Sequence, residues 1–159
     1  KPGEYNVNYL GFNYRMTDFQ AAMGYNQIKE YNINLKRRKQ IAKTYDRLLK
    51  KNKNVILPRI SESDSYFVYQ ILLKNKKGKN SLLKAFKDKG IGCSVHYGTP
   101  LPLMTYYKKK YRIPLNKIAN AKNYGDNVLS LPVYPKLTNK NIDYICQVVN
   151  KTILWKRFS

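Results

Sequence analysis

One segment, residues 66–73, limits the fold of this chain more than any other. It is rich in aromatic and branched side chains, and charge follows only beyond its end, which predicts a buried strand. A strand needs neighbours, and the other extended segments, residues 55–58 and 91–95, are short. Residues 130–135 cannot form a central strand, because their two prolines lack the backbone N–H that a ladder requires. The sequence therefore predicts a small sheet, antiparallel or mixed.

Helical patterns flank these strands. Thr17 and Gln20 have the spacing of a capping box, in which each side chain bonds the backbone N–H of the other residue, so a helix is expected to start here. A second helix is expected over residues 35–50, with an apolar face and a basic face. The last helix follows Thr138 and carries one apolar stripe. The stripe consists of Ile142, Ile145, Cys146, Val149 and Ile153.

The middle of the chain contains shorter elements. We expect a turn over residues 74–80, a helix over 81–89, a tyrosine-rich helix after the loop 96–102, and a helix over 116–129. Two helices, then strands mixed with helices, then a terminal helix predict an α+β domain with a small sheet packed against helices.

The chain is strongly basic, with 31 Lys and Arg against 9 Asp and Glu in 159 residues and a net charge of +22. Such a charge raises the hypothesis of a nucleic-acid-binding module. However, 24 of the basic residues are Lys and the chain has 17 Asn, a joint excess that codon drift in an AT-rich genome produces. Two interpretations stay open: solvated surface charge on a biased background, or a surface for an anionic partner such as a nucleotide or a phosphorylated cofactor.

Several classes of site and protein are disfavoured. The longest apolar run is interrupted by Gln70 and is too short for a membrane helix, and no signal peptide is visible, so we expect a cytoplasmic protein without a membrane partner. One His and two Cys have no recognised zinc spacing, and Cys93 and Cys146 are expected to be small buried residues. The chain begins with Lys1, which indicates a numbering that starts inside a longer protein or the removal of a segment.

Two places could bind a ligand. His96 lies in the loop at the end of an expected strand, where it is either a site residue or a structural histidine. Asn13, Tyr14 and Arg15 stand directly before the expected helix start, where an amide, a phenol and a guanidinium suit an anion. The alternative there is an Arg15 that only pairs with a local carboxylate.

Motifs along nearly the whole chain resemble the DegT/DnrJ/EryC1/StrS family of sugar aminotransferases, which use pyridoxal phosphate. Residues 11–24, Gly-Phe-Asn-Tyr-Arg-Met-Thr-Asp-Phe-Gln-Ala-Ala-Met-Gly, look like the signature of that family. Several motifs in the right order are more specific than any one of them. One departure, Pro102 where the family commonly has His, concerns the identity of the substrate. The other similar segments are residues 38–45, 66–69, 90–101 and 129–138.

The resemblance implies the small C-terminal domain of a fold-type I enzyme, similar to aspartate aminotransferase. Residues 1–30 would be the end of the large-domain region with its linking helix, and residues 31–159 the small domain. The N-terminal domain, with the lysine that binds pyridoxal phosphate and the aspartate facing the pyridine nitrogen, is absent. No residue of this chain is therefore expected to be catalytic, and the fragment alone is expected to be inactive.

The resemblance also implies roles for individual residues. Asn13 would bind the cofactor phosphate of a neighbouring subunit, so the expected partner is a second copy in a homodimer with shared active sites. His96 and Tyr97 match positions near the sugar-nucleotide site, and Tyr14 and Arg15 are expected beside it.

The expected function of the complete protein is transfer of an amino group from glutamate to a keto sugar nucleotide, in polysaccharide, lipopolysaccharide or amino-sugar biosynthesis. The alternatives are a sugar dehydratase of the same family, in which His replaces the upstream lysine, and a basic nucleic-acid-binding module. A stand-alone remnant that keeps only a dimerising or substrate-covering role is a further alternative.

Overall fold

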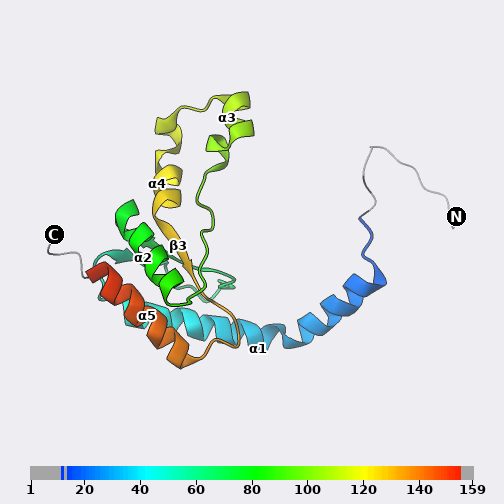
Figure 1. Ribbon diagram of the computed structural model, residues 1–159. Coiled ribbons are helices and arrows are strands. Elements are labelled where there is room, and N and C mark those ends of the chain that lie inside the picture. The colour runs from blue at the N-terminus through cyan, green and yellow to red at the C-terminus, as the bar shows by residue number, and fades with distance from the viewer. Residues whose placement is uncertain (1–11, 13, 155–159) are drawn as a thin grey trace. The chain divides into compact units, whose positions relative to one another are not determined.

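The computed structural model describes residue 12 and residues 14–154. The chain divides into two compact units, Lys1–Asn32 and Ile33–Ser159, and the division falls within the long helix α1 (Asp18–Leu49). The C-terminal unit contains the sheet and the other described helices (Figure 1). It therefore contains the hydrophobic core.

The start of α1 is the predicted capping box. The Thr17 N–H donates to Gln20 Oε1 at 3.0 Å, and the Gln20 N–H donates to Thr17 Oγ1 at 3.3 Å. The prediction of a separate helix from residue 35 was wrong, because α1 runs without a break to Leu49. No proline and no glycine follow Gly24 within α1, so nothing in the sequence ends the first helix.

The sheet has three antiparallel strands in the order β1 (Val55–Ile56), β2 (Tyr69–Leu73) and β3 (Val128–Leu131). This confirms the small antiparallel sheet, and β3 is an edge strand that ends before its first proline. The strand predicted over residues 91–95 was wrong, since only a single bridge joins Ser94 to Ser130.

The helices on the sheet confirm part of the predicted pattern. Helix α5 (Asn139–Leu154) is capped by Thr138, whose Oγ1 accepts from the Asn141 N–H at 3.2 Å, and its predicted apolar stripe is buried. Helix α2 (Lys76–Asp88) starts inside the predicted turn, because the Asn75 side chain accepts from the Gly78 N–H at 2.8 Å and caps the first turn.

A connecting segment with four short helical elements separates α2 from β3. They are the 3-10 helix η1 (Leu101–Leu103), α3 (Thr105–Tyr111), the 3-10 helix η2 (Leu115–Ile118) and α4 (Ala119–Asn127). The tyrosine-rich helix was predicted, whereas the helix expected over residues 116–129 ends at Asn127 and its last two residues open β3. Figure 1 shows α3 at the tip of this connecting segment and α4 leading back to the sheet.

The core joins side chains of α1, α2, α5 and the sheet. Tyr45 of α1 and Tyr69 of β2 are fully buried, with ring centroids 5.1 Å apart. The Tyr45 hydroxyl donates to the Pro132 carbonyl oxygen at 2.9 Å, so it links α1 to the segment after β3. Burial raises the pKa of both phenols well above their usual range.

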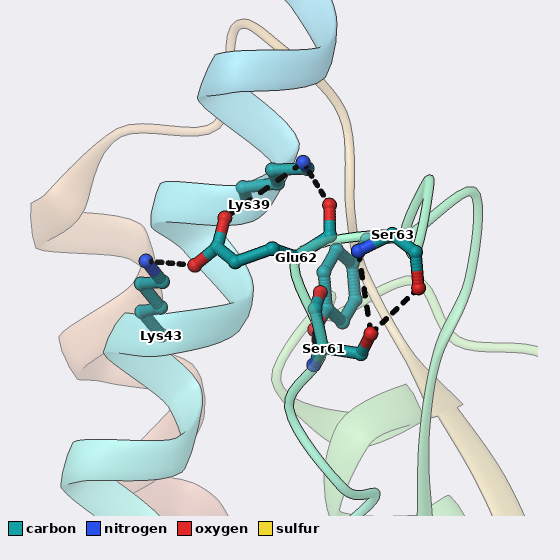
Figure 2. Close-up of polar contacts among 6 residues, drawn as sticks. Lys39, Lys43, Ser61, Glu62 and Ser63 are labelled. Atoms are coloured by element: carbon teal, nitrogen blue, oxygen red, sulfur yellow. Dashed lines mark hydrogen bonds and ion pairs between the residues drawn. The ribbon is translucent and has the colours of Figure 1, made fainter.

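The loop before β2 is fastened to α1, as Figure 2 shows. The Lys43 ammonium lies 2.7 Å from Glu62 Oε1, and Lys39 bonds the Glu62 carbonyl oxygen. Tyr66 has a left-handed backbone with φ of 47°, and its hydroxyl donates to the Ser61 carbonyl oxygen at 2.9 Å. A left-handed residue cannot continue a strand, so residue 66 does not belong to β2, which begins at Tyr69 and not at residue 66 as predicted.

Candidate functional site

A pocket of about 680 Å³ opens between β2, the loop after Ser94 and α4; we call it the His96 pocket. Its walls are residues 67 and 68 just before β2, residue 70 of β2, part of the segment 96–104, and Ala121 and Tyr124 of α4. Among the described residues, no Lys, Arg, Asp or Glu lines it. An uncharged wall with several aromatic rings suits a neutral ring better than a phosphate group.

His96 is held from one side by two serines. Its Nδ1 lies 3.1 Å from Ser94 Oγ and 3.0 Å from Ser130 Oγ, and the backbones of these serines are joined by the bridge beside β3. Because both hydroxyls engage Nδ1, Nε2 is the nitrogen from which His96 can address a ligand. The Tyr97 ring lies edge-on to the imidazole, with centroids 5.6 Å apart, and is 74% exposed.

Gln70 connects the three walls of the pocket. Its side-chain amide donates to the His96 carbonyl oxygen, and its Oε1 accepts from the Tyr124 hydroxyl at 2.9 Å. Partial burial raises the pKa of the Tyr124 phenol and so further favours the protonated form that donates this hydrogen bond. Gln70 thus fixes the loop and α4 relative to β2.

The structure brings two of the five predicted site residues together. His96 and Tyr97 both line the His96 pocket. Tyr14 and Arg15 belong to the N-terminal unit, where both side chains are exposed. Asn13 lies outside the described residues.

Sequence reasoning missed Gln70 and Tyr124. Gln70 counted only as an interruption of an apolar run, although a polar residue within a half-buried strand is itself a signal of a specific hydrogen bond. Tyr124 is one of 15 tyrosines and carries no local signal, since its role depends on the approach of α4 to β2.

Other kinds of site find no support in the described part of the chain. No group of three or more His, Cys, Asp or Glu residues there could hold a metal ion. Both cysteines are free; Cys146 is buried and its pKa is raised to about 12 by burial, while Cys93 is half-buried. None of the helices formed by residues 18–154 has the length and apolar character needed to traverse a bilayer.

A model of the DegT/DnrJ/EryC1/StrS aminotransferase family matches residues 1–150. The chain belongs to this family. The spore coat polysaccharide biosynthesis protein SpsC of Bacillus subtilis is 30% identical over 155 residues, which are 94% of this chain and 40% of SpsC. A UDP-4-amino-4,6-dideoxy-N-acetyl-β-L-altrosamine transaminase of Campylobacter jejuni is 33% identical over 140 residues, 86% of this chain and 36% of that protein.

Solved structures of family members confirm the fold. The aminotransferase PseC of Helicobacter pylori, involved in the biosynthesis of pseudaminic acid, matches with a TM-score of 0.82 and 28% identity over 98% of this chain and 42% of PseC. Spr1654 of Streptococcus pneumoniae, in its PMP form, matches with a TM-score of 0.84 and 25% identity over 96% of this chain and 39% of its own. The chain spans about 40% of the length of the curated relatives it matches.

Proposed function

We propose that this chain is the C-terminal portion of a pyridoxal-phosphate-dependent aminotransferase that acts on a keto sugar nucleotide, in the biosynthesis of a polysaccharide, a lipopolysaccharide or an amino sugar. The observation that carries the proposal is the His96 pocket, whose residues His96 and Tyr97 lie in a segment that resembles a family motif, in a chain that belongs to an aminotransferase family. In the proposed reaction, glutamate gives its amino group and becomes 2-oxoglutarate, and the amino group replaces the carbonyl oxygen of the sugar.

We propose pyridoxal phosphate as the cofactor of the complete protein. Solved structures of Spr1654 include its PMP and PLP forms, which supports pyridoxal phosphate as the cofactor here. When bound, this cofactor carries the amino group between donor and acceptor. The His96 pocket has no lysine and no aspartate among its lining residues, so the groups that attach and tune the cofactor belong in our proposal to a part of the protein outside this chain.

The residues of the pocket would bind and orient the sugar nucleotide. His96 Nε2 and the exposed hydroxyl of Tyr97 would hydrogen-bond its polar groups, while the aromatic and aliphatic walls would pack on its ring. Its charged diphosphate would lie outside this uncharged lining. Tyr14 and Arg15 are proposed as further neighbours of the substrate.

The proposed assembly is a homodimer with shared active sites, in which Asn13 binds the cofactor phosphate of the partner subunit. The N-terminal unit supports a protein partner, because the first turns of α1 expose large apolar side chains: Phe19 is 74% exposed, Met23 53% and Ile28 74%. Ala21, Ala22 and Gly24 on the same helix are small enough to allow close packing of another helix.

The test uses the complete protein, purified with pyridoxal phosphate. Glutamate alone should convert the bound PLP to PMP and release 2-oxoglutarate, which absorbance spectra follow without knowledge of the sugar. In the reverse direction, 2-oxoglutarate should yield glutamate with UDP-4-amino-4,6-dideoxy-N-acetyl-β-L-altrosamine or GDP-perosamine, the compounds in the names of relatives. If the protein binds PLP but glutamate does not convert this PLP to PMP, the proposal is contradicted.

A variant in this chain separates the two half-reactions. His96→Gln should raise the KM for the sugar nucleotide that the wild type accepts, because the Nε2 contact is lost or displaced. The glutamate half-reaction should keep its wild-type rate, since the pocket is proposed to bind the sugar nucleotide only. An equal loss in both half-reactions would instead indicate that His96 acts at the cofactor.

A further inference from the structure

Two glycines bring a wall of the His96 pocket against α4 with no side chain between them. A Cβ built on Gly125 of α4 would lie 2.8 Å from the carbonyl carbon of Gly98, closer still to its carbonyl oxygen, and 3.3 Å from the carbonyl oxygen of Tyr97. Real Cβ atoms essentially never approach backbone this closely, and neither neighbour is a flexible side chain that could move away. Only glycine at position 125 allows the loop to lie where it does.

A buried lysine holds the other side of Gly125. Lys79 of α2 is only 8% exposed, and its ammonium donates to the Gly125 carbonyl oxygen at 2.8 Å. This carbonyl lies in the last turn of α4, where backbone acceptors lack partners within the helix and the helix dipole favours a cation. Burial lowers the pKa of Lys79, and the negative charge of Asp126 opposes that effect.

These three residues, Lys79, Gly98 and Gly125, form a clasp between α2, α4 and the loop. Both sides of the clasp are adjacent in sequence to pocket residues: Tyr97 precedes Gly98, and Tyr124 precedes Gly125. The Gln70 hydrogen bonds join the same loop and helix to β2 but do not set how closely the two backbones approach.

We propose that Lys79 and Gly125 are positioning residues that set the spacing between the His96–Tyr97 wall and the Tyr124 wall of the pocket, and thereby its fit to the sugar nucleotide. This inference rests on the proposed function of the pocket. Neither residue lines the pocket, so both act through the residues next to them in the clasp.

A methyl group at position 125 must push the loop away from α4. The walls would then lie farther apart, and the substrate would lose contacts it makes in both the ground state and the transition state. Loss of such uniform binding raises KM and leaves kcat nearly unchanged.

The experiment compares Gly125→Ala and Lys79→Met with two matched controls in the complete protein. Gly92→Ala adds the same methyl group where nothing lies within 4 Å, and Lys84→Met removes an exposed ammonium from the same helix as Lys79. The probe is whichever of the two sugar nucleotides named above the wild type accepts. All assays are run well below the melting temperature of every variant.

We expect the KM for the probe to rise about tenfold or more in Gly125→Ala, and in the same direction but less in Lys79→Met, with kcat within about threefold of wild type. Both controls should keep the wild-type KM. Wild-type KM values in Gly125→Ala and Lys79→Met, even with lowered melting temperatures, would overturn the inference and leave a structural role only.

Two further outcomes are decisive. If Gly125→Ala does not fold, Lys79→Met against Lys84→Met decides by the same criterion. If glutamate does not convert the PLP bound to the wild-type protein into PMP, the proposed function fails. In that case the clasp inference, which depends on it, fails with it; an active wild type with unchanged variants contradicts the clasp alone.

Discussion

The hydroxyl of Tyr124 donates a hydrogen bond of 2.9 Å to the side-chain oxygen of Gln70. The amide end of Gln70 donates in turn to the backbone of His96, so one side chain from β2 is engaged at both ends. The two hydrogen bonds of Gln70 therefore connect three elements that are distant in sequence and together form the pocket. Loss of these hydrogen bonds should weaken ligand binding and lower stability.

Tyr124→Phe tests that link. Removal of the hydroxyl should lower the free energy of unfolding by about 0.5–1.5 kcal/mol, the usual net value of a hydrogen bond, and raise the KM for the sugar nucleotide. Urea denaturation and steady-state kinetics measure the two effects. Tyr144→Phe is the control, because Tyr144 lies on α5 outside the pocket lining and is 44% exposed. Equal effects of the two substitutions on KM would count against the link.

Tyr45 and Tyr69 form a matched pair in the core. Tyr45→Phe should destabilise the fold by about 1 kcal/mol, since it leaves the Pro132 carbonyl oxygen without the 2.9 Å hydrogen bond. Tyr69→Phe should be neutral or stabilising, because the buried Tyr69 hydroxyl has no hydrogen-bond partner within the part of the chain that the structure describes. Chemical denaturation of both variants measures the two changes in the free energy of unfolding. Similar losses in both would contradict the assignment.

The Glu62 contacts in Figure 2 predict a pH window. The hydrogen bond from Lys43 lowers the pKa of Glu62 below its ordinary 4.5 and raises that of Lys43 above its ordinary 10.5. Because folding lowers the pKa of Glu62, this carboxylate stabilises the fold at a pH above its ordinary pKa. The stabilisation is lost as the pH falls through the lowered pKa. Because folding raises the pKa of Lys43, this ammonium group stabilises the fold at a pH below its ordinary pKa. The stabilisation is lost as the pH rises through the raised pKa. The stabilisation by the pair is therefore complete between these two ordinary values and is lost progressively outside them.

Glu62→Gln should lower the melting temperature slightly near neutral pH in dilute buffer. The difference from wild type should shrink as pH falls below the ordinary carboxyl pKa and in about 1 M salt, since both groups are solvent-exposed and screened. Melting curves at a neutral and an acidic pH and at two salt concentrations test this. A difference that persists in acid would assign the effect to something other than the ion pair.

Local sequence signals predicted the parts of the fold that depend on neighbours in the chain. The Thr17 capping box, the Thr138 cap and the buried stripe of α5 all follow from short-range spacing, and all are present. Residues 128–131 were assigned partly to a helix, because a short apolar run has no decisive period. Residues 128–131 are extended because they pair antiparallel with β2, and this pairing cannot be inferred from their local sequence.

The candidate site was predictable only in part, for the same reason. His96 was singled out by its position in a loop, and both His96 and Tyr97 by their resemblance to family positions. The structure places both residues in one pocket. Gln70, Tyr124 and the Gly98–Gly125 approach join residues that are far apart in sequence. Such contacts depend on how α4 returns to the sheet, so no spacing in the chain could indicate them.

The basic cluster on α3 is expected to be solvated surface charge. Lys108, Lys109 and Lys110 are exposed, and none of them lines the His96 pocket. Their joint replacement by Gln should leave kcat and KM of the complete enzyme nearly unchanged, which steady-state kinetics with the sugar nucleotide measures. A large rise in KM would show that the cluster binds the substrate, and salt-dependent binding to random duplex DNA that disappears in the variant would favour a nucleic-acid role.

Asn13 is proposed to bind a cofactor phosphate that other donors also hold. Asn13→Ala would remove one hydrogen bond to a charged group, worth roughly 1.5–3 kcal/mol. Cofactor affinity in the complete enzyme should therefore fall by about ten- to a hundredfold. The rate at saturating cofactor should change much less, because the amide would contact no reacting atom. Equilibrium titration with pyridoxal phosphate, compared with steady-state rates at saturation, measures both. Unchanged affinity would remove Asn13 from the site.

The same residue tests the shared active site. Asn13→Asp should be more harmful than Asn13→Ala, because it sets a carboxylate against a phosphate. If Asn13 acts across the dimer, an inactive Asn13→Asp chain mixed with a chain lacking the upstream lysine gives one site with both defects and one site with neither. A verified mixed dimer should then recover up to about half of wild-type activity, although each parent is inactive. If Asn13 served the cofactor of its own subunit, each site would keep one defect, and the mixed dimer would stay inactive.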